Sequence, residues 1–190
     1  GTLKLGASDR MADASALVVT GTFDLGGFSE TVGSISGAGT ITSSASGVLT
    51  LTAGSDNTST NFSGVIQNGS ATYVALYKSG SGTLTLSGAN TYNGTTTISA
   101  GTLKLGNVAA LSSFSGRVTV STSSAAFDLA GFTLTSAPSL TLNGTGISSG
   151  GALMNSGAAA TYSGLMTLGS ASSIVGGTGA ITISNVGTIT

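Results

Sequence analysis

The chain of 190 residues contains no cysteine and no histidine. Without these residues, the Ser-His and Cys-His arrangements that activate a nucleophile cannot be built within the chain. The usual zinc ligands are missing, and no disulfide framework can form. We therefore expect no catalytic residue, no metal site and no cofactor-binding site in this segment.

Charge is also scarce, because charged residues make up only 6% of the chain and the formal net charge is −1. About 25% is usual in globular proteins. A nucleic-acid-binding protein needs a basic face to neutralise phosphates, so we expect no nucleic-acid partner. No stretch approaches the ~18 consecutive apolar residues of a membrane helix, so we expect no membrane insertion by this segment.

The chain has one proline and 31 glycines, and about a third of its residues are serine or threonine. A flexible linker of that composition would lack the apolar residues that alternate with threonine here. Period-2 alternation of this kind predicts short strands with apolar side chains inward and threonine outward. It appears in residues 48–52, 83–86, 140–142 and 181–183.

Parts of the sequence recur over long distances. The string GTLKLG stands at Gly1–Gly6 and again at Gly101–Gly106, and FDLGGF at Phe23–Phe28 is matched by FDLAGF at Phe127–Phe132. We interpret residues 1–190 as a single β-solenoid segment with two degenerate long repeat units, 1–100 and 101–190. At about 20 residues per coil, typical of solenoid repeats, it would make about nine coils.

The stretch Gly80–Gly106, GSGTLTLSGANTYNGTTTISAGTLKLG, is the most distinctive part of the sequence. It resembles the passenger-associated transport repeat of Gram-negative autotransporters, which has the pattern GxGTLTLSGxNTYxGxTTIxxGTLxLG. At two of the x positions the family usually has a small residue and a glycine, where this chain has the polar, turn-compatible Asn93 and Thr95. The resemblance implies an all-β, right-handed parallel β-helix on the bacterial cell surface, anchored to the outer membrane through a part not present here. It implies no particular chemistry.

In such a helix we expect Leu84, Leu86, Leu103 and Leu105 to point inward, because residues i and i+2 share one face of a strand. The apolar run from Tyr73 to Tyr77 is interpreted as a core strand whose tyrosines reach outward. A local adhesive patch is the alternative. We expect the aromatic residues to be the large core fillers: Phe23, Phe28, Phe62, Tyr92, Phe127, Phe132 and Tyr162.

Acidic residues are too dispersed to suggest a catalytic pair. Asp24 and Asp128 hold equivalent places in the FDL strings, so they should lie several coils apart, beyond the ~5–10 Å that paired glycosidase carboxylates require. We expect both to cap turns with their short side chains. We expect Asp9 and Asp13 to be solvated near Arg10. The full set of acids is Asp9, Asp13, Asp24, Glu30, Asp56 and Asp128.

Thr-x-Thr pairs invite comparison with ice-binding solenoids, in which threonine ladders run at one spacing along one face. Here the first threonines of successive pairs are separated by 10, 33, 12 and 38 positions. That irregularity favours solvated strand faces over an ice-binding ladder. The pairs begin at Thr40, Thr50, Thr83, Thr95 and Thr133.

The sequence thus favours a non-enzymatic, extracellular structural segment: a stalk, spacer or adhesin body of an autotransporter-like surface protein. Its expected partners are adjacent repeats of the same longer chain, or other copies that stack end to end into a filament. A surface glycan or a ligand on a host or neighbouring cell is a further partner to consider. A carbohydrate-active β-helix enzyme and a carbohydrate-binding adhesin remain as alternative functions.

Overall fold

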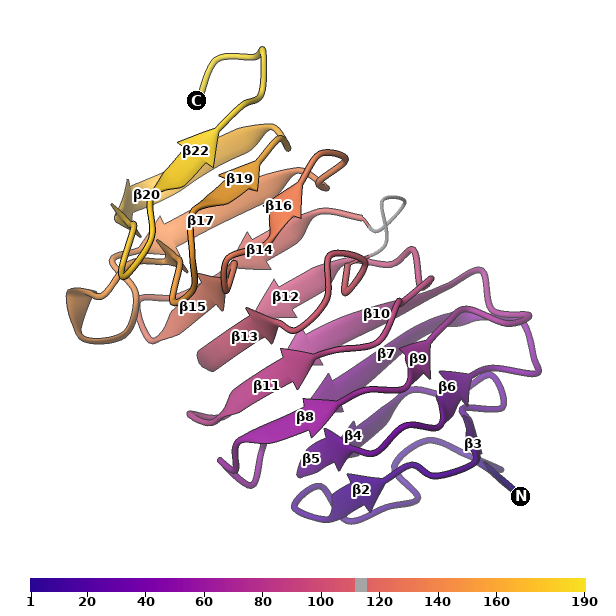
Figure 1. The fold of residues 1–190 in the computed structure, drawn as a ribbon. Helices are drawn as coiled ribbons and strands as arrows, with labels where there is room; N and C mark the ends of the chain where they lie inside the picture. The colour runs from indigo at the N-terminus through magenta and orange to yellow at the C-terminus, as the bar shows by residue number, and fades with distance from the viewer. Residues whose placement is uncertain (112–115) are drawn as a thin grey trace.

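The computed structural model describes residues 1–111 and 116–190, and its strands are stacked into a parallel β-solenoid of about eight turns. Figure 1 shows successive strands lying one above another, with the two termini at opposite ends of the stack. All recorded strand pairs are parallel, and the order of strands in each sheet skips the intervening elements of the chain. This confirms the expected parallel β-helix. Its right-handedness and its division into two long units stay predictions.

The longest sheet, which we call face A, has seven strands that run through most of the solenoid. Inward and outward side chains alternate along them, as in Val48–Ala53, where Leu49, Leu51 and Ala53 are buried. In stacking order the strands are β4 (Glu30–Val32), β7 (Val48–Ala53), β10 (Tyr73–Lys78), β12 (Thr96–Ile98), β14 (Val118–Val120), β17 (Leu140–Gly144) and β20 (Met166–Ser172).

A second sheet, face B, has six strands, and a bridge between Gly37 and Phe62 places the pair β2–β5 beside its first strand. The pair comprises β2 (Ala16–Val18) and β5 (Ser34–Ser36). The six strands are β8 (Thr60–Phe62), β11 (Thr83–Leu86), β13 (Gly101–Leu105), β15 (Ala125–Asp128), β18 (Leu153–Met154) and β21 (Ile174–Val175).

The third side, face C, consists of two separate sheets of four and three strands. The first contains β1 (Thr2–Lys4), β3 (Thr22–Asp24), β6 (Thr40–Thr42) and β9 (Val65–Ile66). The second contains β16 (Thr133–Leu134), β19 (Ala160–Tyr162) and β22 (Ile181–Ile183). A single 3-10 turn, η1 (Ile147–Ser149), is the only helical element of the described residues.

The interior is a continuous stack of apolar side chains contributed by all three faces. The four leucines expected to point inward on β11 and β13 are each at most 3% exposed, which confirms that assignment. Phe127 and Tyr162 meet edge to face, with ring centroids 6.3 Å apart. Such contacts between coils let each turn of the solenoid bury the face of its neighbour.

The structure refines two expectations about this core. The solenoid makes about eight turns where about nine were expected, because most coils are longer than 20 residues: successive strands of face A start 18 to 26 positions apart. Phe28 and Phe132 pack against the core but are only partly buried. Each follows two residues with positive φ, such as Gly26 at 60° and Gly27 at 91°, which turn the chain toward the surface.

Candidate functional site

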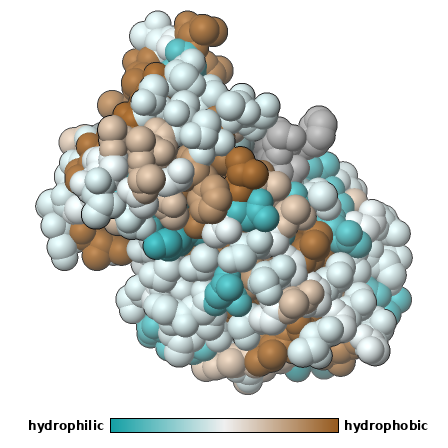
Figure 2. Space-filling view, viewed as in Figure 1, coloured by the Kyte–Doolittle hydropathy of each residue, from teal (hydrophilic) through white to brown (hydrophobic). Residues whose placement is uncertain are grey.

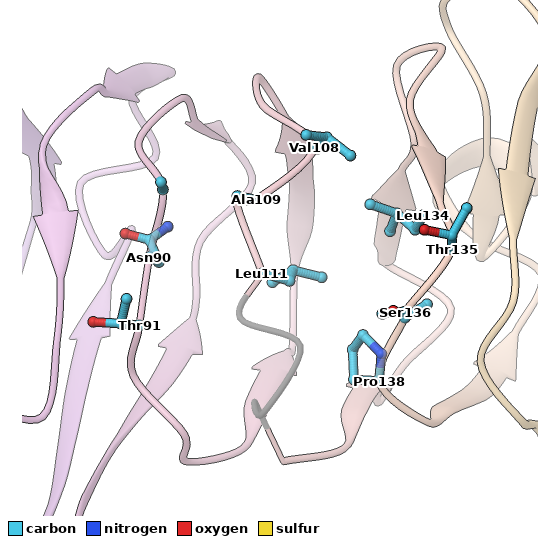
Figure 3. A pocket seen from close by; sticks show the side chains of 11 residues that line it. Asn90, Thr91, Val108, Ala109, Leu111, Leu134, Thr135, Ser136 and Pro138 are labelled. Carbon is cyan, nitrogen blue, oxygen red and sulfur yellow. The ribbon is translucent and has the colours of Figure 1, made fainter.

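A cavity of about 610 Å³ lies on face C, where the sheet is interrupted between β9 and β16 (Figure 3). Val108 and Leu111 border it on one side, and Leu134 and Pro138 on the other. None of the lining residues that the structure describes is ionisable. They are Ala89, Asn90, Thr91, Val108, Ala109, Leu111, Leu134, Thr135, Ser136, Ala137 and Pro138.

The side-chain amide of Asn90, which borders the cavity, already forms hydrogen bonds with the backbone. Its Oδ1 accepts a hydrogen bond from Ile66 N at 2.8 Å, and its Nδ2 donates to Ala110 O at 2.7 Å. Asn90 therefore replaces missing strand hydrogen bonds at the interruption. Among the described residues, the lining offers apolar contact and the hydroxyl groups of Thr91, Thr135 and Ser136, and it contains no acidic or basic side chain.

Asp24 accepts hydrogen bonds from two consecutive turns of the solenoid. Its Oδ1 accepts hydrogen bonds from Gly26 N at 2.8 Å and Ser44 N at 2.7 Å, and Lys4 Nζ lies 3.9 Å from Oδ2. Burial raises the pKa of Asp24, but the hydrogen bonds from Ser44 and Gly26 and the charge of Lys4 outweigh burial and hold it below its ordinary value.

Asp128 repeats this arrangement on another face. Its Oδ1 accepts hydrogen bonds from Ala130 N and Ser156 N, both at 2.9 Å, and its Oδ2 accepts one from Ser156 Oγ at 2.6 Å. Asp24 lies on β3 of face C and Asp128 on β15 of face B. Both carboxylates therefore cap turns, as the sequence indicated, and the structure does not bring them together.

The remaining acids are also engaged in backbone contacts or exposed. Glu30 is buried at the start of face A and accepts hydrogen bonds from Arg10 N at 2.9 Å and Met11 N at 3.2 Å. Asp9 and Asp13 are exposed. Within residues 1–111 and 116–190, no group of three or more His, Cys, Asp or Glu residues could hold a metal ion.

Asp56 caps its own loop. Its Oδ1 accepts hydrogen bonds from Thr58 N at 2.9 Å and Thr58 Oγ1 at 2.8 Å. Burial raises the pKa of this carboxyl, and the hydrogen bonds from Thr58 and Ser34 lower it further than burial raises it. Asp56 is also the acid whose charge acts on the one buried lysine of the solenoid, Lys78.

Lys78 is a buried charged residue of the kind found at functional sites, and it was not singled out from the sequence. It is 1% exposed and occupies an inward position of face A, between Ala53 and Ile98 in register. Its Nζ donates to three carbonyl oxygens, those of Ser79 at 2.6 Å, Gly80 at 2.8 Å and Ala100 at 3.1 Å.

These three bonds tie the turn after β10 to the equivalent turn one coil later. Burial lowers the pKa of Lys78 to about 8, and the charge of Asp56 opposes that effect. The alternation Val74-x-Leu76-x-Lys78 places Lys78 on the inward side of β10. This position was not recognised from the sequence because lysine is almost always exposed in folded proteins. We assign Lys78 a structural role at this corner of the solenoid, because the three N–H donors of its ammonium group all bind backbone carbonyl oxygens there.

The Thr-x-Thr pairs of the sequence lie on three different faces. Those at Thr50 and Thr95 belong to face A, the one at Thr83 to face B, and those at Thr40 and Thr133 to face C. They therefore do not form one ladder. No helix among the described residues is long and apolar enough to cross a membrane.

Residues 76–105 match the family model described as the passenger-associated transport repeat. The match begins within β10, includes β11 and β12, and ends at the last residue of β13, so it covers somewhat more than one coil. No curated protein and no solved structure matches the chain in the corresponding comparisons.

Proposed function

We propose that this chain, which carries a passenger-associated transport repeat, is a non-enzymatic structural segment of an autotransporter passenger and is presented outside the cell. The observation that carries this proposal is the repeat at residues 76–105, whose strands belong to faces A and B of a parallel solenoid. In a solenoid each coil contacts only its neighbours, so added coils lengthen a stalk or spacer without requiring a new core.

The disposition of ionisable groups supports a structural role. Asp24 and Asp128 bind backbone N–H groups of their own turn and of the next coil, and Lys78 binds three carbonyl oxygens. The hydrogen-bonding groups of these side chains therefore serve to join neighbouring coils. A carbohydrate-active enzyme would need two carboxylates facing one groove, about 5–10 Å apart.

A surface-display experiment tests this proposal. The chain would be placed between a secretion signal and an autotransporter β-barrel in a Gram-negative host, and intact cells would be treated with an external protease. We expect the chain to become accessible to antibody at the surface and to leave a protease-resistant fragment. Leu103→Asp, which places a charge in the core, should remove that resistance, whereas the outward control Thr102→Asp should keep it.

Two results would contradict the proposal. One is retention of the chain inside cells in which the same barrel exports another passenger. The other is release of reducing ends or unsaturated products from a panel of neutral and uronate polysaccharides by the purified chain. Product release that disappears in Asp24→Asn or Asp128→Asn would establish an enzyme in place of a structural segment.

End-to-end contact between copies is a second candidate role, favoured by the exposure of apolar residues in the outermost strands. Leu3 on β1, the register partner of buried Phe23, is 54% exposed, and Leu168 on β20 and Ile174 on β21 are about 40% exposed. Figure 2 shows brown, apolar residues around the strands nearest the C-terminus, on a surface that is otherwise mostly pale. Either a neighbouring coil or a second copy would bury them.

Sedimentation and electron microscopy of the purified chain distinguish whether a neighbouring coil or a second copy buries these apolar residues. Stacking predicts rods longer than one chain, and Ile174→Lys should shorten them because it places a charge in the contact. The outward substitution Thr85→Lys on β11 is the control and should leave the rods unchanged. A chain that stays monomeric at high concentration would assign the covering role to neighbouring coils.

A further inference from the structure

Face A carries a column of threonines that the sequence spacing conceals. Register partners along its seven strands place six threonines and one tyrosine at the same outward position. Neighbouring strands lie about 4.8 Å apart, so the column presents hydroxyl groups at that interval. We call it the threonine column, and its members are Thr31, Thr52, Tyr77, Thr97, Thr119, Thr141 and Thr167.

The centre of this face holds two exposed aromatic rings. Tyr73 and Tyr77 are 38% and 37% exposed, while Val74 and Leu76 between them are buried, so both rings stand on the outward side of β10. Val48, the register partner of Tyr73, is 60% exposed. A tyrosine presents an apolar ring with a hydroxyl at its tip, and both of these rings lie on the solvent-facing side of β10.

The same face is almost free of charge. Glu30 and Lys78 are the only charged residues in its seven strands, and both are inward and 1% exposed. Arg117, just before β14, is exposed beside the face. A surface without a charge pattern gives no electrostatic preference to a nucleic acid, a polyuronate or an acidic protein. It complements an uncharged partner rich in hydroxyl groups.

We propose that face A binds a neutral polysaccharide chain. The rings of Tyr73 and Tyr77 lie against the apolar faces of sugar rings, and the hydroxyls of the flanking threonines exchange hydrogen bonds with sugar hydroxyls. A threonine hydroxyl is both donor and acceptor, as a sugar hydroxyl is, so the column suits such a chain at several registers. An ice lattice would need a flat face, and the two rings stand above the threonines at its centre.

This inference is separate from the proposed role in surface presentation, because it is tested on the purified chain without export. The probes are insoluble cellulose, chitin and β-1,3-glucan in sedimentation assays, and xylan and galactomannan in affinity electrophoresis. The informative variant is Tyr73→Thr/Tyr77→Thr, which removes both rings, replaces them with β-branched residues that favour strands, and completes the threonine column.

A second variant, Thr97→Ala/Thr119→Ala, removes two hydroxyls from the column and leaves the rings in place. The matched control, Thr83→Ala/Thr102→Ala, removes two register-paired threonines from face B. Circular dichroism and melting curves establish that each variant is folded before its binding is measured.

We expect the chain to retain at least one neutral polysaccharide of the panel. Tyr73→Thr/Tyr77→Thr should weaken that binding at least about tenfold, Thr97→Ala/Thr119→Ala about threefold, and the face B control less than twofold. Absence of binding to the whole panel would overturn the proposal, as would unchanged binding by a folded tyrosine variant. Thermal hysteresis that increases in the tyrosine variant and falls in the threonine variant would overturn it in favour of ice.

Discussion

Lys104 on β13 and Asp128 on β15 are register partners, with Nζ and Oδ2 3.6 Å apart. Lys4 and Asp24 form the same pair at 3.9 Å on face C. The recurrence of GTLKLG before FDL in the sequence therefore corresponds to a two-strand module used twice, on different faces of the solenoid. In each module the lysine is more exposed than the aspartate, and the aspartate also binds two backbone N–H groups.

The aspartate of this module should matter more than its lysine. Asp128→Ala leaves the N–H groups of Ala130 and Ser156 without their acceptor, so we expect a loss of about 2 kcal/mol in the free energy of unfolding. Lys104→Ala removes a partly exposed ion pair and an exposed hydrogen bond from Nζ to Ser156 Oγ, and should cost less than about 1 kcal/mol. Urea denaturation followed by circular dichroism measures both. A larger loss for Lys104→Ala would mean that the ion pair, and not the turn, dominates.

The same substitution should have very different effects on stability at two adjacent residues of β11. Leu84 is 3% exposed and Thr85 is partly exposed on the other side of the strand. Leu84→Asp buries an unpaired charge and should cost several kcal/mol, so the chain aggregates or unfolds. Thr85→Asp places the charge outside, next to Lys104 in register, and should change stability by less than about 0.5 kcal/mol. Equal effects on soluble yield and melting temperature would contradict the inward and outward assignment.

Lys78 predicts an unusual dependence of stability on pH. Its pKa in the folded chain is about 8, below the ordinary 10.5, so between these values the unfolded chain binds more protons. Stability should therefore rise as pH increases from about 8 toward 10. Above pH 10 the buried Tyr92, whose pKa burial raises to about 12, acts in the opposite direction, because the folded chain then holds the extra proton.

Melting temperatures measured between pH 7 and 11 test this pair of effects. Lys78→Met should abolish the rise above pH 8 and leave the fall above pH 10. Tyr92→Phe should weaken the fall, to which the raised pKa of Tyr162 also contributes, and leave the rise. A rise that persists unchanged in Lys78→Met would show that another group causes it.

Period-2 alternation was sufficient to predict the strands, the inward leucines and the outward tyrosines of β10, because alternation alone decides which side of a strand a residue occupies. The solenoid itself was predicted from the long-range recurrences and from the resemblance to the transport repeat. The turn-capping role of Asp24 and Asp128 was also predictable, since a short acidic side chain next to a turn readily accepts hydrogen bonds from nearby backbone N–H groups.

The features that could not be predicted from the sequence depend on the register between coils. Members of the threonine column are 20 to 26 positions apart, because the loops between strands differ in length, so no fixed interval reveals them. The carbonyl oxygens that surround Lys78 come from two different coils, so they too were invisible before the strands were aligned. The same holds for Glu30, whose partners precede it by about 20 residues.

The most direct test of the solenoid is a pair of distances along face A. Because the chain has no cysteine, spin labels can be introduced cleanly at Thr31→Cys with Thr141→Cys, and at Thr52→Cys with Thr167→Cys. Each pair is separated by five strand-to-strand steps, so pulsed electron resonance should give two narrow distributions near the same distance, about 24 Å between backbones. Broad distributions, or two clearly different mean distances, would contradict the parallel, in-register stack.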